Sequence, residues 1–449
     1  MAKARHTELV LRRVRVEGFK SLRDVTLELG GPSPLVLVGA NGSGKTNVVE
    51  LFLFLRRALH DDLARRPYAP HAEWGSPRNL TWEASGNPIR VRLEYDLVAG
   101  RGGERSRERL LYTVVFAPDP ALATLIPVYE KIELPGLSYV LERHENMLKA
   151  QLRADEAGDE LCLQLQKHTG ASVEPSEGWC RVAQRLEGRG DVPPLLVAPT
   201  TLPVRVKSKG FLVDLVMLPN CCAALIPFPP NRSGLRASTV LRLLRSWFGG
   251  IVVLRQVDYG SAKWPHNRYS DRTLRPRAEN LAEILYHIMR DPKARERVEA
   301  AMATLFPWLE VRVEFNEYGQ IMLVFYERRG EKSIQLYPAM VPDGAVKLLS
   351  IIAAIALRPS LLAVDEIENS MHAALIDYIM RELEDLGKPA ILTTHSPLVV
   401  DLAGPERTLL LRRSPDGSTI AERLASKELW EKMKEEGLTL SDYYLYAVT

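Results

Sequence analysis

The sequence predicts an α/β protein whose core is a parallel sheet, and three observations support this prediction. Short apolar runs, of the kind that a parallel sheet buries on both faces, occur at Leu35–Val38, Leu361–Val364 and Ala390–Thr394. The first run leads through a glycine-rich loop into an amphipathic segment, Lys45 to about His60, which predicts a helix. Asp365 and His395 directly follow the second and third runs, and open α/β sheets bind ligands at the carboxyl ends of their parallel strands. The sequence therefore predicts a binding site at one edge of the sheet.

The loop after the first apolar run has the composition of a phosphate-binding site. Its glycines allow positive φ, so that backbone N–H groups turn inward around a di- or triphosphate, and the N-terminus of the following helix adds its dipole. Lys45 is expected to reach the β- and γ-phosphates, and Thr46 to place its hydroxyl on Mg²⁺. The expected nucleotide contacts are Gly39, Asn41, Gly42, Ser43, Gly44, Lys45, Thr46 and Asn47.

Two acids and a histidine supply the remaining chemistry of a hydrolysis site. Asp365 and Glu366 follow the second apolar run; Asp365 is expected to hold Mg²⁺ through water and Glu366 to polarise the attacking water. His395 follows the third run and is expected to contact the γ-phosphate. No Asn-Lys-x-Asp motif for guanine is found, so ATP is the expected nucleotide. Catalysis is assigned to Lys45, Glu366 and His395, and metal binding to Thr46 and Asp365.

Several motifs around this site also occur in a known group. Ala40–Ser43 in the loop, Asp365–Asn369, Thr394–Pro397, the opening Val14–Leu22 and the stretch Arg275–Leu285 resemble the ABC-type ATPases of the RecF, SMC and OLD group. The resemblance implies an ABC-type P-loop NTPase head with a split nucleotide-binding core. Within this group the chain resembles OLD-like, RecF-like ATPases. A Toprim nuclease is not expected, because only some fifty residues follow His395 and they hold no acidic Toprim constellation.

The resemblance also implies a homodimer formed on ATP binding, in which a signature loop of one head caps the γ-phosphate bound by the other. The candidate loop is Val341–Ala345, with Asp343 and Gly344 as nucleotide contacts. Pro342 stands where relatives usually carry Ser, and proline offers neither a hydroxyl nor an N–H. The usual side-chain bond to the facing phosphate is then lost, and slower hydrolysis is expected. A plain turn before a core helix is the alternative interpretation.

The nucleotide core is expected to be divided by insertions. The predicted domains are a first part of the ATPase core at 1–87, an antiparallel β-meander at 88–153, an inserted, mostly helical lobe at 154–253, and a second part of the core at 254–449. Period-two segments predict the meander. The inserted lobe rests on helical patches at 160–166, 178–186 and 238–248.

A basic and aromatic stretch is the best candidate for contacting DNA. It comprises Lys263, Trp264, Arg268, Tyr269, Arg272, Arg275 and Arg277. Basic side chains track phosphates and aromatic rings stack on bases. A solvated surface loop is the alternative, because charge runs are usually solvated. The formal net charge of +3 over 449 residues excludes a uniformly basic molecule, so any such contact must be local.

Composition also limits the location and the function. No apolar signal segment begins the chain, and the most membrane-like stretch is broken by Arg358-Pro359, so a cytoplasmic protein without membrane contact is expected. The expected function is a nucleotide-driven switch or motor in antiphage defence or DNA repair that works with an effector protein or nuclease in trans. The alternative is a regulatory ATPase switch that binds a partner protein and does not contact nucleic acid.

Overall fold

The structure is a computed structural model. It describes residues 6–30, 33–60, 71–101, 104–119, 123–135, 137–144, 147–154, 172–176, 179–185, 200–205, 212–217, 237–267 and 272–448. These residues divide into two compact units. The first comprises Met1–Gly30, Phe54–Gly249 and Pro415–Thr419, and the second comprises Gly31–Leu53, Gly250–Ser414 and Ile420–Thr449. Helix α1 (Lys45–Leu59) contributes residues to both units.

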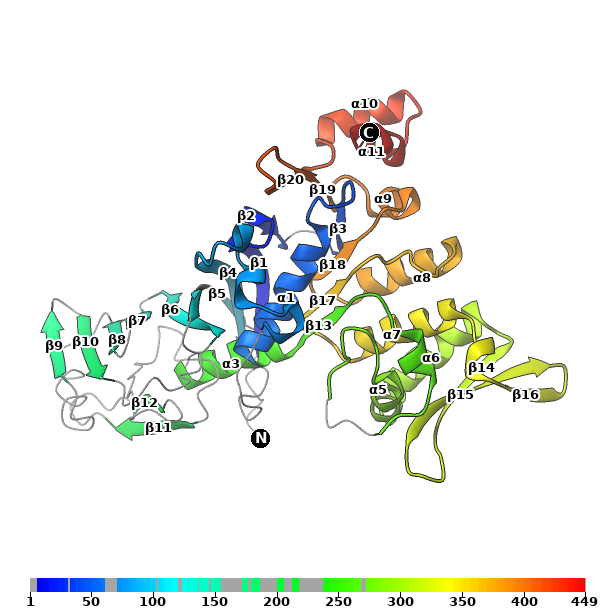
Figure 1. The fold of residues 1–449 in the computed structure, drawn as a ribbon, viewed down its shortest axis with the longest axis horizontal. Helices are drawn as coiled ribbons and strands as arrows, with labels where there is room; N and C mark the ends of the chain where they lie inside the picture. The colour runs from blue at the N-terminus through cyan, green and yellow to red at the C-terminus, as the bar shows by residue number, and fades with distance from the viewer. Residues whose placement is uncertain are drawn as a thin grey trace. The chain divides into compact units, whose positions relative to one another are not determined.

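The first unit is built on a nine-stranded sheet with the strand order β2-β1-β4-β5-β6-β7-β8-β10-β9 (Figure 1). Its strands are β1 (His6–Phe19), β2 (Leu22–Glu28), β4 (Ile89–Arg101), β5 (Glu104–Asp119), β6 (Thr124–Leu134), β7 (Leu137–His144), β8 (Met147–Ala154), β9 (Ser172–Ser176) and β10 (Trp179–Arg185). All neighbouring strands are antiparallel. Strands β4 to β8 pair in chain order, which confirms the predicted meander.

Helix α3 (Ala237–Gly249) packs on this sheet. The ring of Trp247 meets that of Tyr95 edge to face, with 5.0 Å between centroids, and Phe248 meets Tyr112 in the same way at 5.9 Å. All four rings are almost wholly buried, and such pairs stabilise a core beyond the area that they bury. The unit also contains short 3₁₀ turns and a separate hairpin: η1 (Ala72–Trp74), η2 (Pro77–Leu80), η3 (Trp82–Ala84), β11 (Thr200–Arg205) and β12 (Leu212–Met217).

The inserted lobe differs from the prediction. The expected helical patch at 178–186 is wrong: strand β10 occupies it and pairs with β8, with Cys180 opposite Leu152 and Val182 opposite Ala150. Long-range pairing overrides a weak helical periodicity in a segment this short. The patch at 238–248 is confirmed as α3, and the patch at 160–166 lies outside the described residues. The lobe is therefore not mostly helical where it is described. The bounds of the four predicted domains stay a prediction.

The second unit is built on a six-stranded sheet with the order β13-β17-β18-β3-β19-β20 (Figure 1). Its strands are β3 (Leu35–Val38), β13 (Ile251–Leu254), β17 (Leu361–Val364), β18 (Ala390–Thr393), β19 (Thr408–Arg413) and β20 (Thr419–Arg423). From β13 to β19 in this order, each strand is parallel to the next. The three apolar runs are adjacent as β17, β18 and β3, and every residue in these strands is buried, which confirms the predicted core.

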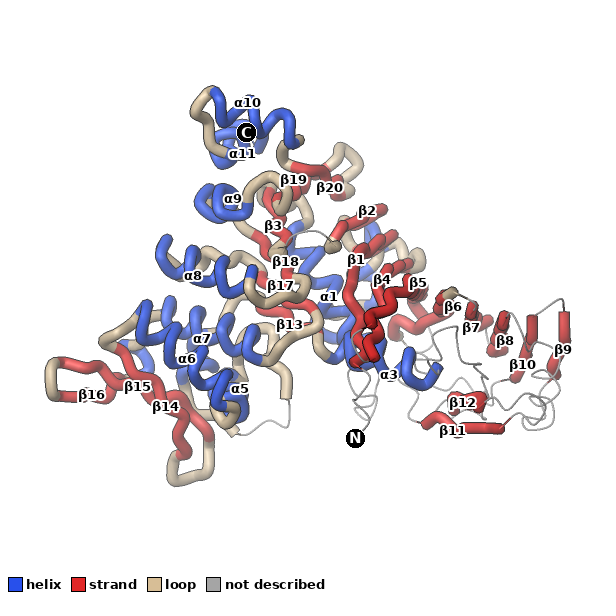
Figure 2. Tube along the Cα trace, turned by 180° about the vertical axis from the view of Figure 1, so that it is seen from behind, coloured by secondary structure: helices blue, strands red, loops and turns tan. Residues whose placement is uncertain are grey.

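Helices and a small second sheet complete this unit. They are α4 (Tyr259–Lys263), α5 (Leu281–Ile288), α6 (Pro292–Leu305), α7 (Asp343–Ala356), α8 (Ala373–Glu384), α9 (Pro397–Ala403), α10 (Lys427–Glu435), α11 (Leu440–Val448), η5 (Pro338–Met340), β14 (Leu309–Phe315), β15 (Ile321–Arg329) and β16 (Lys332–Leu336). Helix α7 is buried from Ala345 to Ile355 and lies beside α5, α6 and α8 (Figure 2). It also contacts α4.

Local sequence signals explain where several of these elements begin. Asp291 caps α6 by accepting a bond from the Lys293 N–H at 3.0 Å, and Pro292 fills the first helical position. Ser426 caps α10 in the same way, accepting from the Leu429 N–H at 3.2 Å. In the part of the chain that the structure describes, none of the helices has both the length and the apolar character needed to span a bilayer.

Candidate nucleotide-binding site

The glycine-rich loop lies between β3 and α1 in the second unit, at the carboxyl edge of the sheet. Gly39, Gly42 and Gly44 have φ of 146°, 78° and 104°, values that side-chain-bearing residues rarely adopt. A Cβ added to Gly39 would overlap the carbonyl oxygen of Leu411 on β19. The loop therefore needs glycine at this position for two reasons, its backbone conformation and the close approach of β19.

Lys45 folds back over this loop. Its Nζ donates to the carbonyl oxygens of Gly39 at 2.8 Å and Ala40 at 3.0 Å, and the residue is only 6% exposed. Burial lowers the pKa of Lys45, and the nearby carboxylates of Asp365 and Glu366 act in the opposite direction. The ammonium thus lies inside the loop and beside the acids that follow β17.

Thr46 and Asp365 lie 319 residues apart in the chain and meet at this edge. The Thr46 hydroxyl donates to Oδ1 of Asp365 at 3.3 Å, and the Thr393 hydroxyl donates to the same oxygen at 2.5 Å. Burial raises the pKa of Asp365, although both hydroxyls oppose that shift. A hydroxyl and a desolvated carboxylate converging on one point form the hard oxygen donor set that Mg²⁺ prefers, so the residues present fit a magnesium ion.

Glu366 is exposed and stands directly beyond β17. It has a positive φ of 48°, and its backbone N–H donates to the Thr393 hydroxyl at 2.8 Å. The side chain of Asn369 donates to its Oε2 at 2.5 Å. A strained backbone that its neighbours hold in place is common at functional sites. The carboxylate is therefore presented to solvent beside the loop, as a group that activates water would need to be.

His395 follows β18 and is held by a carboxylate that the sequence analysis missed. Glu368 accepts from the His395 backbone N–H through Oε1 at 2.6 Å and from the Thr394 hydroxyl through Oε2 at 2.8 Å. The signal was present, since Glu368 lies in the same short acidic string as Asp365 and Glu366. The structure thus brings Lys45, Thr46 and these three acids together, with His395 anchored to Glu368.

Two further charged residues near the site were also missed. Lys347 on α7 is 1% exposed, and burial lowers its pKa to about 8 against the opposing charges of Asp365, Glu368 and Glu366. Arg255 follows β13 and pairs with the buried Glu50 of α1 at 2.9 Å. The sequence signal for Lys347 is a single lysine within an apolar helix. The signal for Arg255 is a charged residue directly after an apolar strand.

The candidate signature loop precedes α7, whose N-cap is Pro342 and lacks a side-chain capping bond. Lys263 on α4 binds this loop instead: its Nζ donates to the Val341 carbonyl at 2.7 Å and to Oδ1 of Asp343 at 2.6 Å. A Cβ on Gly344 would lie 2.7 Å from the carbonyl oxygen of Ser370. The structure therefore joins this loop to α4 and to the segment that follows Glu366.

The contacts of Lys263 correct part of the predicted DNA-binding stretch. Lys263 is 7% exposed and bonded within the protein, so its assignment as a phosphate contact is wrong. Trp264 is 57% exposed, Arg272 and Arg277 are exposed, and Arg275 is half-buried. Arg268 and Tyr269 lie outside the described residues.

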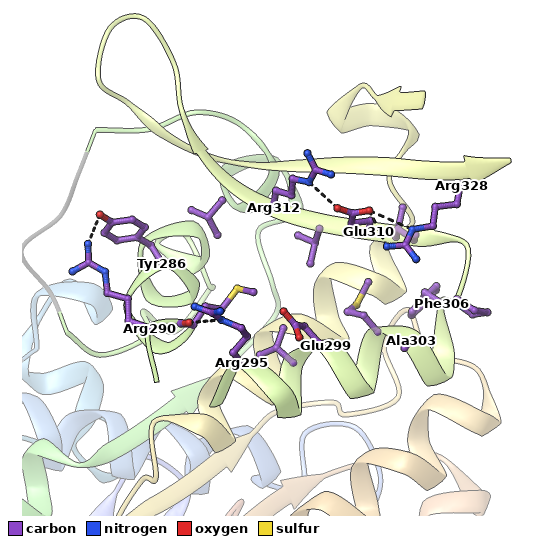
Figure 3. A pocket seen from close by; sticks show the side chains of 16 residues that line it. Tyr286, Arg290, Arg295, Glu299, Ala303, Phe306, Glu310, Arg312 and Arg328 are labelled. Atoms are coloured by element: carbon purple, nitrogen blue, oxygen red, sulfur yellow. Dashed lines mark hydrogen bonds and ion pairs between the residues drawn. The ribbon is translucent and has the colours of Figure 1, made fainter. Parts of the chain in front are cut away.

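A cavity of about 710 Å³ lies elsewhere in the second unit, between α5, α6 and β14 (Figure 3). Its walls include the apolar side chains of Met289, Val298, Met302, Phe306 and Leu309. Charged residues border it: Glu310 pairs with Arg312 at 2.7 Å and Arg328 at 2.9 Å, Arg290 donates to the Tyr286 hydroxyl, and Arg295 donates to the Met289 carbonyl. A volume of this size is typical of ligand and peptide sites.

The parallel sheet, the glycine loop and the acids that follow the adjacent strand define a P-loop NTPase fold. Residues 231–401 match the family described as "AAA domain, putative AbiEii toxin, Type IV TA system". The chain is 42% identical over 158 residues to the DNA replication and repair protein RecF of Brucella abortus (strain 2308), covering 27% of this chain and 41% of that protein. It is 34% identical over 123 residues to RecF of Acidothermus cellulolyticus, covering 25% and 32%.

These matches confirm the resemblance to the ABC-type ATPases of the RecF and SMC group, while the likeness to OLD proteins stays a prediction. The chain spans about two fifths of the length of the RecF protein from Brucella abortus. Similar solved structures include the SmcHead bound to the C-winged helix domain of ScpA, with a TM-score of 0.43 and 13% identity over 94% of this chain and 99% of that chain. The SMC head domain from Thermotoga maritima has a TM-score of 0.36 and 13% identity over 93% and 100%.

Proposed function

We propose that this chain binds ATP with Mg²⁺ and hydrolyses it to ADP and phosphate. The single observation that carries the proposal is the contact between the Thr46 hydroxyl and Asp365, 3.3 Å apart, beside a buried lysine in a glycine loop. Such a contact joins the two halves of a magnesium–phosphate site, one from each end of the sequence.

Each residue then has a defined task in the reaction. The loop N–H groups and Lys45 bind the β- and γ-phosphates, and Thr46 and Asp365 would hold Mg²⁺, which neutralises charge that develops on the transferred phosphoryl group. Glu366 accepts the proton of the attacking water, and His395 contacts the γ-phosphate. The water oxygen bonds to the γ-phosphorus as the bond to the β–γ bridging oxygen breaks, and ADP leaves with that oxygen.

Phosphate release in single-turnover experiments tests this proposal. Glu366→Gln should keep ATP affinity and lose hydrolysis, because the amide cannot accept the proton. Lys45→Ala should lose ATP affinity itself. Wild-type release no faster than that of Glu366→Gln, at saturating ATP and Mg²⁺, would contradict the proposal.

We further propose that two copies form a dimer around ATP. The N-terminus of α7, with Asp343 and Gly344, supplies N–H groups that can cap a phosphate held by the second copy. The loss of the serine hydroxyl at Pro342 makes this cap weaker than in relatives. Mass measured against protein concentration, with ATP and Glu366→Gln, should show a dimer; a strict monomer at all concentrations would remove the idea.

The process in which this switch or motor works is proposed to involve DNA, in repair or antiphage defence, with an effector protein or nuclease supplied in trans. Support comes from the RecF relatives, which are named as DNA replication and repair proteins, and from exposed Trp264, Arg272 and Arg277. Binding of duplex and single-stranded DNA should weaken steeply with salt. Unchanged binding in a variant with Arg272→Glu and Arg277→Glu would exclude this surface.

The cavity in Figure 3 favours a second candidate, a regulatory ATPase that binds a partner protein and no nucleic acid. Its apolar walls and four bordering arginines suit a partner segment that carries both apolar and acidic side chains. ATP turnover stimulated by DNA favours the first candidate. A stable complex with a partner protein in the absence of DNA favours the second.

A further inference from the structure

Lys263 is an unusual residue to find beneath the signature loop. It is the last residue of the five-residue helix α4, which begins at Tyr259. Asp258 caps this helix by accepting from the Ser261 N–H at 3.0 Å. The Lys263 side chain is 9% exposed, and both of its hydrogen bonds, to Val341 and Asp343, lie at the start of α7. A cation is disfavoured at a helix N-terminus, because the helix dipole is positive there.

General stability does not account well for this arrangement. Burying an ammonium costs free energy that a single ion pair rarely recovers, and apolar replacements of buried pairs are often neutral or stabilising. Asp343 is the half-exposed member of the pair, at 49%, so the ammonium carries most of the desolvation. The pair is better explained by the geometry that it imposes on residues 341 to 344 than by the energy that it contributes.

The same cluster reaches the catalytic side of the site. The Tyr259 hydroxyl, one turn before Lys263 on α4, hydrogen-bonds with the side chain of Ser370, and the Lys263 ammonium lies 5.7 Å from the Tyr259 ring centroid. Gly344 packs against the Ser370 carbonyl closely enough to exclude a Cβ. Asn369, the residue before Ser370, donates to Glu366.

We propose that Lys263 is a positioning residue for ATP hydrolysis, which fixes the signature loop relative to the Ser370–Asn369 segment that orients Glu366. Through this loop the chain presents N–H groups to the nucleotide of a second copy, and through Asn369 it aligns its own catalytic carboxylate. Lys263 replaces, by a contact within one copy, part of the order that a serine at position 342 would give. The inference rests on the ATP hydrolysis proposed above.

Removal of the ammonium should therefore slow turnover without weakening nucleotide binding. Lys263→Met keeps the apolar stem and should lower kcat roughly 10- to 100-fold, since small misplacements of reacting groups have effects of this size. ATP affinity, measured in the Glu366→Gln background, should stay within about threefold, because the glycine loop and Lys45 are untouched. A loss that came only from weaker folding would not separate kcat from affinity in this way.

The partner residue provides the decisive comparison. Asp343→Ala, in an exposed position, should reproduce the kcat loss, and the double variant should be no worse than the more damaged single variant, because both remove one interaction. Lys293→Met, at an exposed position on α6, is the matched control and should turn over ATP as wild type does. If Lys263→Met does not fold, Asp343→Ala and Asp343→Asn carry the test by themselves.

The outcomes separate the inference from the function on which it rests. Wild-type kcat in a folded Lys263→Met or Asp343→Ala variant overturns the inference and leaves ATP hydrolysis standing. Independent, multiplicative losses in the double variant also overturn it. A wild-type protein that releases no phosphate overturns the proposed function, and the positioning role falls with it.

Discussion

The carboxylate of Glu368 accepts a hydrogen bond from the backbone N–H of His395, with 2.6 Å between nitrogen and oxygen. Its second oxygen accepts from the Thr394 hydroxyl at 2.8 Å, so both oxygens are engaged at the end of β18. The acid that follows β17 thereby fixes the histidine that follows the neighbouring strand. Two adjacent parallel strands are cross-linked at their carboxyl ends, at the edge where we propose that ATP is hydrolysed.

Replacement of Glu368 should disturb His395 without removing it. We expect Glu368→Ala to lower kcat for ATP hydrolysis roughly 10- to 100-fold while ATP affinity changes little, because the phosphate loop is intact. The kcat of Glu368→Gln should lie between those of the wild type and Glu368→Ala. The glutamine amide keeps one acceptor oxygen, but its NH₂ group faces either the His395 N–H or the Thr394 hydroxyl. Steady-state phosphate release measures the effect. Glu431→Ala, on the exposed face of α10, is the control; equal activity of Glu368→Ala and this control would contradict the role.

Loss of the Thr46 hydroxyl should appear as a changed metal requirement. Thr46→Val removes one oxygen ligand at nearly constant volume, so the Mg²⁺ concentration for half-maximal hydrolysis should rise by about tenfold or more. The titration is made at saturating ATP. Thr439 also donates its hydroxyl to an aspartate, Asp442 at 2.7 Å, but on the exposed start of α11. Thr439→Val should leave the Mg²⁺ dependence unchanged, and an unchanged dependence in Thr46→Val would exclude the hydroxyl as a ligand.

The centre of the sheet could be predicted because the sequences of its three central strands indicate burial on both faces. Leu35–Val38 and Leu361–Val364 are apolar throughout, as only strands covered on both faces are, and the glycine loop has few other uses in that position. Order within the sheet then follows from topology. The contact between Thr46 and Asp365 could be predicted once the strands that precede them were placed close together in one parallel sheet.

Side-chain direction could not be predicted in the same way. The sequence shows Lys263 beside Trp264, a pattern that suits nucleic acid, but the ammonium turns to a carbonyl 78 residues further along the chain. Glu368 was missed although it lies close to Asp365 and Glu366 in the sequence, because the sequence does not show that its carboxylate turns toward the end of β18. Strand β10 was predicted as a helix because seven residues are too few to separate the two periods, and its partner β8 decides the matter.

Gly39 should tolerate no side chain. Gly39→Ala places a Cβ where the Leu411 carbonyl lies and strains a backbone with φ of 146°, so the loop must shift and ATP affinity should be lost. Gly387 is the matched control: its φ is 65°, but a Cβ there meets nothing within 4 Å. Gly387→Ala should cost only the roughly 1–2 kcal/mol of a left-handed residue and keep ATP affinity. Isothermal titration measures the ATP affinity of both variants, and chemical denaturation measures their stability. Equal ATP affinity in Gly39→Ala and Gly387→Ala would contradict the close approach of the Leu411 carbonyl to Gly39.

The buried Lys347 should make stability depend on pH in a window that can be named. Its pKa is lowered by burial to about 8 in the folded protein, against 10.5 as the ordinary value. Between these pH values the unfolded chain binds more protons than the folded one. The contribution of Lys347 to the free energy of unfolding therefore increases as the pH rises from 8 to 10.5. Below pH 8 the group is charged in both states and the desolvation penalty is constant.

Lys347→Met removes this dependence, so the difference in unfolding free energy, wild type minus variant, should increase by about 3 kcal/mol from pH 7 to 10.5. Urea denaturation at several pH values measures it, with Lys293→Met as the exposed control. A difference that stays constant across this range would show that Lys347 is not held in a desolvated environment beside the three acids.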